Sequence, residues 1–482
     1  MSKVIDAWNN ADFEFVAAQK LSRFKRKDIR LAIRESRYAL KLIDAARTDG
    51  SVREPGSSTD APKVVTILHA SLPNHTGGYT GRAQGLLKGL AENGLEVRAY
   101  TRPGFYNERV DSSAEFPFPV DEVDGVKYHH LPIDVSRTKG EFEYMVSCIA
   151  WYREVFLAER PNIVHLRSTY LIALPAMIAA HQLGIPVLYE VSGLWELVYE
   201  GRGQTGRARR TIRCEDLVCE YADRIVSMNN SMANLLAERN SKAIEVGLVP
   251  NAVDAQRFAV IDDLNRVDNF KFDFGYVGSL VDYEGLDNLI EAVAIAKKKS
   301  RTLTGKIVGK GQQYDLLKEK VAELGLEQQI ALPGPVSADQ AVLQFQDVNI
   351  VVLPRKSTPA TENVTPLKPF EAMAAGRPLL VSNVAALEEV SGNGRYAEVF
   401  QEGDPQDLAN ALVSLLDDRQ RQEKLVVEAR KLVIEKHNWT YVAKAMADEL
   451  QEYSSVVTAL PNVVYDQTIM HNGDLVISSM ER

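Results

Sequence analysis

Cysteine is scarce in this chain of 482 residues, with only Cys148, Cys214 and Cys219. Three cysteines at these spacings do not suit a zinc site, and an odd number does not indicate a disulfide framework. Isolated cysteines of this kind are typical of buried thiols in a reducing compartment. We therefore expect a cytoplasmic protein without a bound metal.

Long hydrophobic runs and an excess of positive charge are also missing. The longest apolar runs fall well short of the ~20 residues that span a bilayer, and the N-terminal sequence MSKVIDAWNN lacks the apolar core of a signal peptide. The formal net charge is -9, which argues against a dedicated nucleic-acid binder. These absences predict a protein that is soluble or lies peripherally at the inner face of the plasma membrane.

Alternating strand and helix patterns begin at Lys63. The strand KVVTILHA is followed by a loop containing Gly77 and Gly78, a helix with Arg82 in its first turn, and the strand LEVRAYT. The spacing G-x-G-x-x-G of dinucleotide-binding proteins is absent. Two adjacent glycines let the backbone pass close to a ligand, although a glycine pair in a loop is more often a plain turn.

Two further strands are predicted at 162–168 and 186–193, which continues the pattern of a doubly wound sheet. They place His165 and Glu190 near the carboxyl ends of strands, where such sheets bind ligands. A basic, glycine-containing stretch follows at 201–213 and is interpreted as a mobile loop. It could clamp a phosphate, touch lipid headgroups or simply be solvated.

The most informative stretch is TENVTPLKPFEAMAAGRP, residues 361–378, between the apolar runs NIVVLP and LLVS. This pattern predicts a crossover helix between parallel strands. The prolines predict a helix start near Pro366 or Leu367, and Gly376 should end the helix after Ala375.

Two charged side chains of this helix point to a ligand. Lys368 adds positive charge beside the free N–H groups of the first turn, which favours an anion there. Glu371 can accept hydrogen bonds from both hydroxyls of a ribose. An N-capped core helix without a ligand is the alternative interpretation.

The sequence PLKPFEAMAAGRPLLVSN, with the pair Glu388 and Glu389 downstream, resembles the donor-binding signature of glycosyltransferase family 4. That resemblance implies an α/β protein of the GT-B fold, in which two Rossmann-like domains with parallel sheets face each other across a cleft. It also implies retaining, metal-independent transfer from a nucleotide sugar, without any cofactor.

The chain is expected to divide into six parts. They are a basic helical extension at 1–47, a flexible linker at 48–62, an N-terminal acceptor-side domain at 63–249, a C-terminal donor-binding domain at 250–436, a helix crossing back at 437–455 and an unassigned tail at 456–482.

The chain departs from its resemblance to the family at the diphosphate site. Many members carry an arginine and a lysine where this chain has Ser279 and Glu284. A glutamate cannot neutralise a diphosphate, so Lys368, Arg355 and the residues 364–367 are the expected substitutes. The resemblance implies the following donor-binding residues: Glu371, Thr365, Leu367, Arg355, Gly278, Gly309, Gly311 and Gly334. On the acceptor and phosphate side it implies Gly77, Gly78 and Arg82.

A second departure concerns the catalytic residues. The family's first glutamate corresponds to Asn363, and the nearest acid, Glu362, is one residue out of register. Either Asn363 holds a sugar hydroxyl or Glu362 bulges into the site. We favour Asn363, because a shift of one residue in an extended loop reverses the side-chain direction. The candidate catalytic residues are Lys368, Asn363, Glu190 and His165.

The function implied by this resemblance is hexosyl transfer to a glycan or lipid-linked acceptor, in a subgroup that makes bacterial surface polysaccharides. Two alternatives stay open: a nucleotide-sugar epimerase or hydrolase on the same fold, and an inactive scaffold that recruits partners. The pattern of apolar and basic residues in 1–47 predicts a basic amphipathic helix, which either packs on the protein itself or contacts an anionic membrane.

Overall fold

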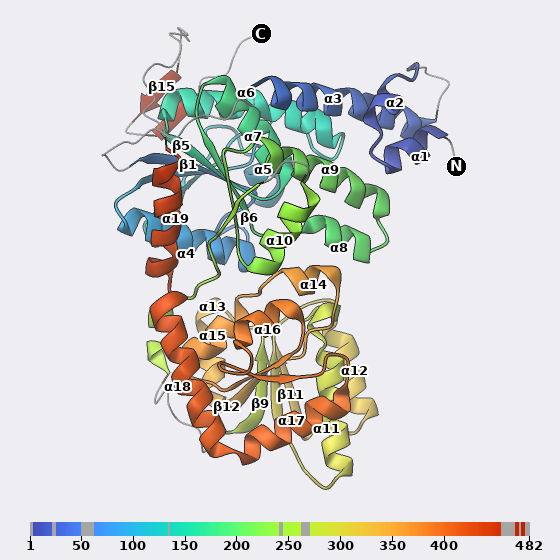
Figure 1. The fold of residues 1–482 in the computed structure, drawn as a ribbon, viewed down its shortest axis with the longest axis vertical. Helices are drawn as coiled ribbons and strands as arrows, with labels where there is room; N and C mark the ends of the chain where they lie inside the picture. The colour runs from blue at the N-terminus through green and yellow to red at the C-terminus, as the bar shows by residue number, and fades with distance from the viewer. Residues whose placement is uncertain are drawn as a thin grey trace. The chain divides into compact units, whose positions relative to one another are not determined.

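The structure is a computed structural model that describes residues 3–21, 26–49, 62–133, 135–240, 244–261, 270–454, 468–471 and 474–477. The chain divides into two compact units, shown with their elements in Figure 1. Unit 1 comprises Met1–Val249 with Ala443–Arg482, and unit 2 comprises Pro250–Val442. The predicted linker lies largely outside the described residues.

Unit 1 is built on an eight-stranded sheet with the order β3-β4-β2-β1-β5-β6-β7-β8. Its neighbouring strands pair in parallel, except β3 with β4. Every residue of β5 and β6 is buried, because helices cover both faces of a parallel sheet. The strands are β1 (Lys63–Leu68), β2 (Glu96–Thr101), β3 (Asp121–Val123), β4 (Val126–His129), β5 (Ile163–Arg167), β6 (Val187–Val191), β7 (Arg224–Ser227) and β8 (Val246–Leu248).

The helices of unit 1 alternate with these strands, and three of them precede the sheet. They are α1 (Lys3–Asn9), α2 (Phe13–Ala17), α3 (Lys27–Asp49), α4 (Gly78–Glu92), α5 (Phe105–Arg109), α6 (Glu141–Glu159), α7 (Tyr170–Gln182), α8 (Trp195–Gly201), α9 (Thr205–Tyr221) and α10 (Asn230–Arg239). The described part of the tail is an antiparallel pair, β15 (Thr468–His471) with β16 (Asp474–Ile477).

The predicted N-terminal helical extension is present as α1 to α3, and its apolar face packs on the protein itself. Ile33 and Ile43 of α3 are buried. The carboxylate of Glu35 accepts a hydrogen bond of 2.8 Å from the backbone N–H of Phe142 at the start of α6. Arg34 forms an ion pair of 3.2 Å with Glu143. Of the two predicted fates of this face, packing within unit 1 is the one observed.

The prediction of a mobile basic loop at 201–213 is wrong. Most of this stretch is the first half of α9, and its arginines bind the N-terminal helices. The guanidinium of Arg210 lies 4.3 Å from the ring centroid of Trp8, and that of Arg213 lies 4.7 Å from Phe13. Arg213 also pairs with Glu14 at 2.5 Å. These arginines therefore hold α1 and α2 on α9.

Unit 2 is built on a six-stranded, all-parallel sheet with the order β11-β10-β9-β12-β13-β14. Its strands are β9 (Phe272–Val277), β10 (Gly305–Val308), β11 (Ile330–Gly334), β12 (Val348–Leu353), β13 (Leu379–Ser382) and β14 (Glu398–Phe400). Its helices are α11 (Leu286–Lys298), α12 (Tyr314–Glu323), α13 (Ala338–Leu343), α14 (Pro359–Asn363), α15 (Lys368–Ala374), α16 (Ala385–Ser391), α17 (Pro405–Asp417) and α18 (Arg419–Lys436), and α19 (Trp439–Glu452) then runs from unit 2 into unit 1.

Two parallel-sheet α/β units with an N-terminal helical extension confirm the predicted fold class. The three cysteines are free and buried, as predicted. Within the described ranges, no helix has both the length and the apolar character needed to cross a bilayer.

Candidate functional site

The candidate site of unit 2 lies at the carboxyl edge of its sheet. Because all six strands are parallel, the loops that follow β9, β10 and β12 emerge at the same edge. Open parallel sheets bind ligands there. These loops carry most of the predicted donor-binding residues.

Glycines let the first two of these loops run backbone against backbone. The N–H of Gly278 donates to the carbonyl of Val308 at 3.0 Å. A Cβ at Gly309 would overlap the carbonyl oxygen of Gly278, and a Cβ at Gly311 would overlap that of Leu280. The N–H of Gly309 donates to the carbonyl of Gly334 at 3.1 Å. The predicted glycines are thus needed for loop packing, and a contact of theirs with a nucleotide base stays a prediction.

Gly278 also makes room for the principal cation of the site. A Cβ at Gly278 would overlap the Cε of Lys368, so the lysine side chain lies directly over this glycine. Lys368 is the first residue of α15. The lysine is thereby directed along the end of β9 rather than into solvent.

Glu284 lies between the two predicted phosphate-binding cations. Its Oε1 accepts hydrogen bonds from Lys368 Nζ at 2.8 Å and from an Arg355 guanidinium nitrogen at 3.4 Å. Glu284 is 1% exposed, and its Oε2 is buried without a hydrogen-bond partner. Burial raises the pKa of Glu284, but Lys368 and Arg355 outweigh burial and lower the pKa below its usual value. The acid that the sequence places at the diphosphate site is therefore charged and already paired.

Arg355 also stabilises the loop between β12 and α15. Another nitrogen of its guanidinium donates to the carbonyl of Val364 at 3.0 Å, which closes the loop between β12 and α15. The arginine is 7% exposed. Its cation therefore contributes mainly through its charge rather than through an open hydrogen-bonding face.

Glu371 is one turn beyond Lys368 on α15. Its carboxylate has no hydrogen bond or ion pair with any residue that the structure describes. Burial raises the pKa of Glu371, while the charges of Lys368 and Arg257 oppose that rise. A carboxylate with free acceptor positions beside a lysine suits a ligand with two neighbouring hydroxyl groups.

The predicted extended loop around Asn363 is wrong, because residues 359–363 form the short helix α14. The side-chain amide of Asn363 donates to the carbonyl of Pro359 at 2.8 Å. The alternative acid, Glu362, accepts hydrogen bonds from Ser357 Oγ at 2.5 Å and from the N–H of Ala385 at 2.7 Å. The carboxylate of Glu362 therefore stabilises the first turn of α16.

The start of α15 follows the prediction closely. Leu367 is its N-cap residue, and the helix ends at Ala374, with Gly376 at φ 66° two residues later. Thr365 is buried, and its carbonyl accepts a hydrogen bond of 2.7 Å from Asn251. Thr365 therefore offers its side chain to the protein interior, and its backbone anchors the loop.

In unit 1, Glu190 is the centre of a fully buried ion cluster. Its carboxylate accepts hydrogen bonds from Arg82 Nε at 2.7 Å, from Arg167 Nε at 3.0 Å and from His165 Nε2 at 3.0 Å. Burial raises the pKa of Glu190, but Arg167 and Arg82 outweigh it, so the pKa lies well below its usual value. Burial lowers the pKa of His165.

This cluster changes the interpretation of three predicted residues. Arg82 is 2% exposed and also donates to the carbonyl of Val249 at 2.7 Å, so it does not face a phosphate. Glu190 and His165 have no exposed surface either. Gly77 and Gly78 do lie at the start of α4, as predicted.

Arg167 is not among the predicted site residues, although the sequence carries a signal for it. Residues two apart on a strand share a face, so His165 and Arg167 both project from one face of β5. Arg167 is paired in register with Glu190 on β6. The spacing of His165 and Arg167 on one strand is therefore the local signal that points to Arg167 as a neighbour of Glu190.

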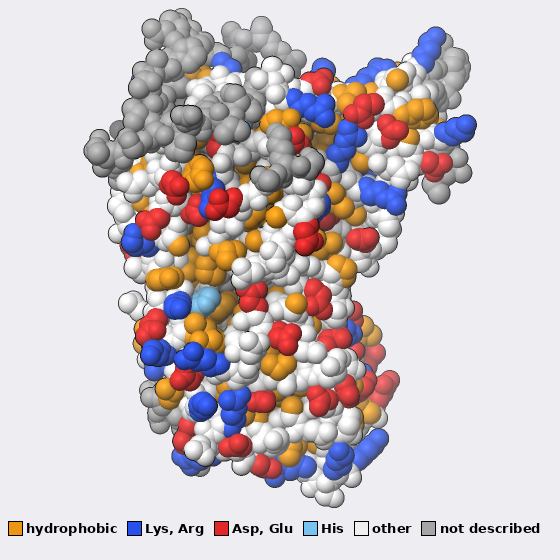
Figure 2. Space-filling model, viewed as in Figure 1, with side chains coloured by type: hydrophobic (Ala, Val, Ile, Leu, Met, Phe, Trp, Pro, Cys, Tyr) orange, Lys and Arg blue, Asp and Glu red, His pale blue; other side chains and the backbone are white. Residues whose placement is uncertain are grey.

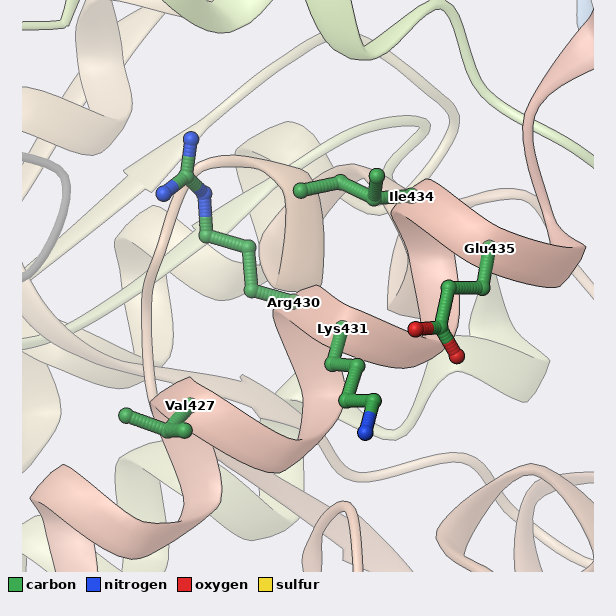
Figure 3. Close-up of a pocket in the computed structure, with 5 residues that line it drawn as sticks. All are labelled: Val427, Arg430, Lys431, Ile434 and Glu435. Carbon is green, nitrogen blue, oxygen red and sulfur yellow. The ribbon is translucent and has the colours of Figure 1, made fainter.

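A shallow hollow elsewhere in unit 2 does not belong to the candidate site. It is lined by Val427, Arg430, Lys431, Ile434 and Glu435 (Figure 3). All five side chains project from α18, and no loop of the sheet edge contributes.

Comparisons with known proteins find matches over both units of the chain. The family model described as "Glycosyl transferase 4-like domain" matches residues 77–252, and the one described as "Glycosyl transferases group 1" matches residues 262–432. A glycogen synthase of Mycobacterium tuberculosis is 25% identical over 289 residues, which cover 60% of this chain and 68% of that protein. A D-inositol 3-phosphate glycosyltransferase of Paenarthrobacter aurescens is 25% identical over 371 residues, covering 72% and 86%.

Solved structures share the fold. A sucrose-phosphate synthase from Thermosynechococcus elongatus superimposes with a TM-score of 0.63 at 19% identity, covering 81% of this chain and 98% of that one. The Anabaena protein HepE, crystallised with UDP, gives a TM-score of 0.62 at 16% identity, covering 80% and 99%.

Proposed function

The chain belongs to glycosyltransferase family 4 and has the GT-B fold, and we propose that it is a retaining, metal-independent hexosyltransferase. The proposed donor is a nucleoside-diphosphate sugar. The proposed acceptor is a glycan or a lipid-linked glycan of a bacterial surface polysaccharide. One observation carries the proposal: Lys368 and the unpaired carboxylate of Glu371 stand one turn apart at the carboxyl edge of the unit 2 sheet.

In the proposed complex, Glu371 accepts hydrogen bonds from the ribose hydroxyls, and Lys368 and Arg355 lie near the diphosphate. A nucleoside diphosphate in the solved HepE structure supports this donor class. Gly278, Gly309, Gly311 and Gly334 are proposed to bring main-chain groups close to the base.

The proposed chemistry needs little from the protein besides positive charge and positioning. The bond from the anomeric carbon to the diphosphate breaks, and the acceptor oxygen bonds to that carbon on the same face of the sugar. The acceptor proton passes to the departing phosphate oxygen. Lys368 stabilises the negative charge that grows on the diphosphate, and Asn363 is proposed to hold a sugar hydroxyl. Glu190 and His165 are fully buried within unit 1, so no step of this chemistry is assigned to them.

The proposal can be tested with a panel of nucleotide sugars and detection of donor hydrolysis and transfer by mass spectrometry. We expect turnover with at least one donor, and a loss of about 100-fold or more on Lys368→Ala or Glu371→Ala. Lys318→Ala is the matched control, because Lys318 is an exposed lysine of α12 in the same unit. No binding of any donor, with all three variants equal to wild type, would overturn the proposal.

One observation favours a second candidate, an inactive scaffold. Glu284 pairs with both Lys368 and Arg355, which reduces the net charge of this group to +1. The same assay separates the candidates: a scaffold binds or turns over no nucleotide sugar, whereas an epimerase or hydrolase consumes donor without transfer.

We also propose a peripheral contact of α2 and α3 with an anionic membrane. Phe15, Leu21 and Leu31 are 42%, 48% and 41% exposed, and the basic residues Arg37 and Lys41 of α3 are exposed too. Figure 2 shows hydrophobic and basic side chains near one another over this region, with acidic side chains interspersed among them. Such a surface suits shallow insertion among anionic headgroups.

Point variants are the proper test of this contact, because removing α1 to α3 would expose their buried partners on α6 and α9. We expect Phe15→Ser with Leu31→Ser to reduce flotation with phosphatidylglycerol vesicles several-fold. Leu316→Ser changes an exposed leucine of α12 instead and should leave flotation unchanged. Equal flotation of all proteins, or none by wild type, would exclude the contact.

A further inference from the structure

A group of basic side chains lies at the carboxyl ends of β1 and β2 in unit 1, outside the residues discussed so far. His69 directly follows β1, and Arg102 directly follows β2. The N–H of Arg102 donates to the carbonyl of Leu68 at 2.8 Å, which joins the two strand ends. This edge of a parallel sheet is where ligands bind.

Two arginines of this group donate hydrogen bonds to the same carboxylate. Arg102 donates to both oxygens of Glu108, at 3.2 and 2.5 Å. Arg137 Nε lies 3.1 Å from each of those oxygens. Arg102 is 1% exposed, whereas the side chain of Arg137 is 34% exposed. Two guanidinium forks that converge on one carboxylate present the geometry that also binds phosphate.

More positive charge is present than Glu108 can balance. Burial, followed by the charges of Arg102, Arg137, His75 and Arg109, lowers the pKa of His69 to about 3. Arg109 has no ion-pair partner in the part of the chain that the structure describes. Arg102, Arg109, Arg137 and Glu108 together carry a net charge of +2, and Glu141 is a further acid near Tyr199 at the edge of the group. The Nδ1 atom of His69 is buried without a hydrogen-bond partner.

An exposed aromatic surface adjoins the basic group. Burial raises the pKa of Tyr199 on α8, and the charges of Arg207 and Arg137 oppose that rise. The ring of Tyr199 lies 6.1 Å from that of Trp195, measured between centroids. Trp195 is 45% exposed, and it follows the carboxyl end of β6 closely. A flat, exposed indole can pack against the C–H face of a sugar ring.

We propose that Arg109 and Arg137 bind a phosphate group of the acceptor, that the buried Arg102 adds its positive charge from behind Glu108, and that Trp195 packs against the sugar next to that phosphate. The acceptor is then a phosphorylated sugar or a glycan joined to a lipid through a diphosphate. Glu108 holds Arg102 and Arg137 in place and competes with the incoming anion. This inference rests on the proposed transferase function and names the chemical class of its acceptor.

Binding to the full-length protein tests the inference, with inorganic pyrophosphate and glucose 1-phosphate as probes in titration calorimetry. We expect Arg109→Gln and Arg137→Gln each to weaken both probes about tenfold, the effect of losing one charge-assisted contact. Glu108→Gln should tighten both, because it removes the competing carboxylate. Trp195→Ala should weaken glucose 1-phosphate alone. Arg153→Gln, an arginine on α6 outside the group, is the control.

The donor site must be distinguished from this one. If Lys368→Gln abolishes pyrophosphate binding while Arg109→Gln and Arg137→Gln do not, the anion binds in unit 2 and the inference fails. Equal binding by all variants also overturns it. A detergent-solubilised polyprenyl-diphosphate sugar, compared with glucose 1-phosphate, shows which source of phosphate is preferred. Donor turnover, measured separately, reports whether the proposed function itself has failed.

Discussion

The Nζ of Lys368 lies 2.8 Å from Oε1 of Glu284, which stands where many family members carry a diphosphate-binding lysine. The carboxylate is almost completely buried, and Arg355 approaches the same oxygen. The cation that should meet the donor diphosphate is therefore already shared with an acid of the protein. We expect this pairing to set the affinity of the proposed donor site for a diphosphate.

Glu284→Gln should tighten binding of nucleoside diphosphates. The change raises the net charge of the group from +1 to +2, and an extra unit charge in a partly buried site is worth roughly 1 to 2 kcal/mol. We expect about a tenfold lower Kd for UDP or GDP in calorimetry. Asp282→Asn, a change of equal charge on an exposed neighbour, should have a much smaller effect. Weaker binding by Glu284→Gln would show that the glutamate orients Lys368 for the ligand.

Glu371→Ala should weaken nucleotide binding through the ribose. Loss of a carboxylate that accepts two hydroxyl hydrogen bonds costs about 1.5 to 3 kcal/mol, or roughly 10- to 100-fold in Kd. The comparison ligand is the 2′,3′-dideoxynucleotide, which lacks both hydroxyls. Wild type and Glu371→Ala should bind it equally. A similar loss for both ligands would assign Glu371 to the fold rather than to the ribose.

How far the sequence predicts this site depends on how far apart the interacting residues are along the chain. The start of α15 and its end before Gly376 follow from prolines and a glycine within a few positions. The pairing of Glu284 with Lys368 joins residues 84 positions apart, and that of Arg82 with Glu190 joins residues 108 apart. No local pattern reports such contacts, because they depend on which strands become neighbours.

The helix α14 is a different case, because its signals are local. Thr358 and Thr361 form a capping box, and Pro359 occupies the first turn. These are ordinary helix-start signals. The prediction of an extended loop gave too much weight to Pro366, which follows the helix.

Transfer should continue after metal removal. In the proposed mechanism Lys368 and Arg355 supply the positive charge beside the leaving diphosphate. We expect the initial rate in EDTA to stay within about twofold of the untreated enzyme. A loss of activity that Mg²⁺ or Mn²⁺ restores would contradict the proposed metal independence. Lys368→Ala should remain inactive whether or not these ions are added.

The stability of the protein should fall as pH rises through neutrality because of Glu215 on α9. Its carboxylate accepts hydrogen bonds from the N–H of Tyr170, at 2.9 Å, and from the Tyr189 hydroxyl. Burial, reinforced by the charge of Glu196, raises the pKa of Glu215 to about 7, and the charge of Arg239 opposes the rise. The folded protein therefore holds this proton more tightly than the unfolded chain, in which the pKa is about 4.3.

The sign of the effect follows from that difference. The stabilisation is complete below the unfolded pKa and is lost as pH rises through about 7. Glu215→Gln keeps the side chain neutral at every pH. Relative to this variant, wild type should lose on the order of 2 kcal/mol of unfolding free energy between pH 5 and pH 8. Thermal unfolding followed by circular dichroism measures the difference, with Glu200→Gln, an exposed residue of α8, as the control. Parallel pH profiles for wild type and Glu215→Gln would show that Glu215 does not titrate in this range.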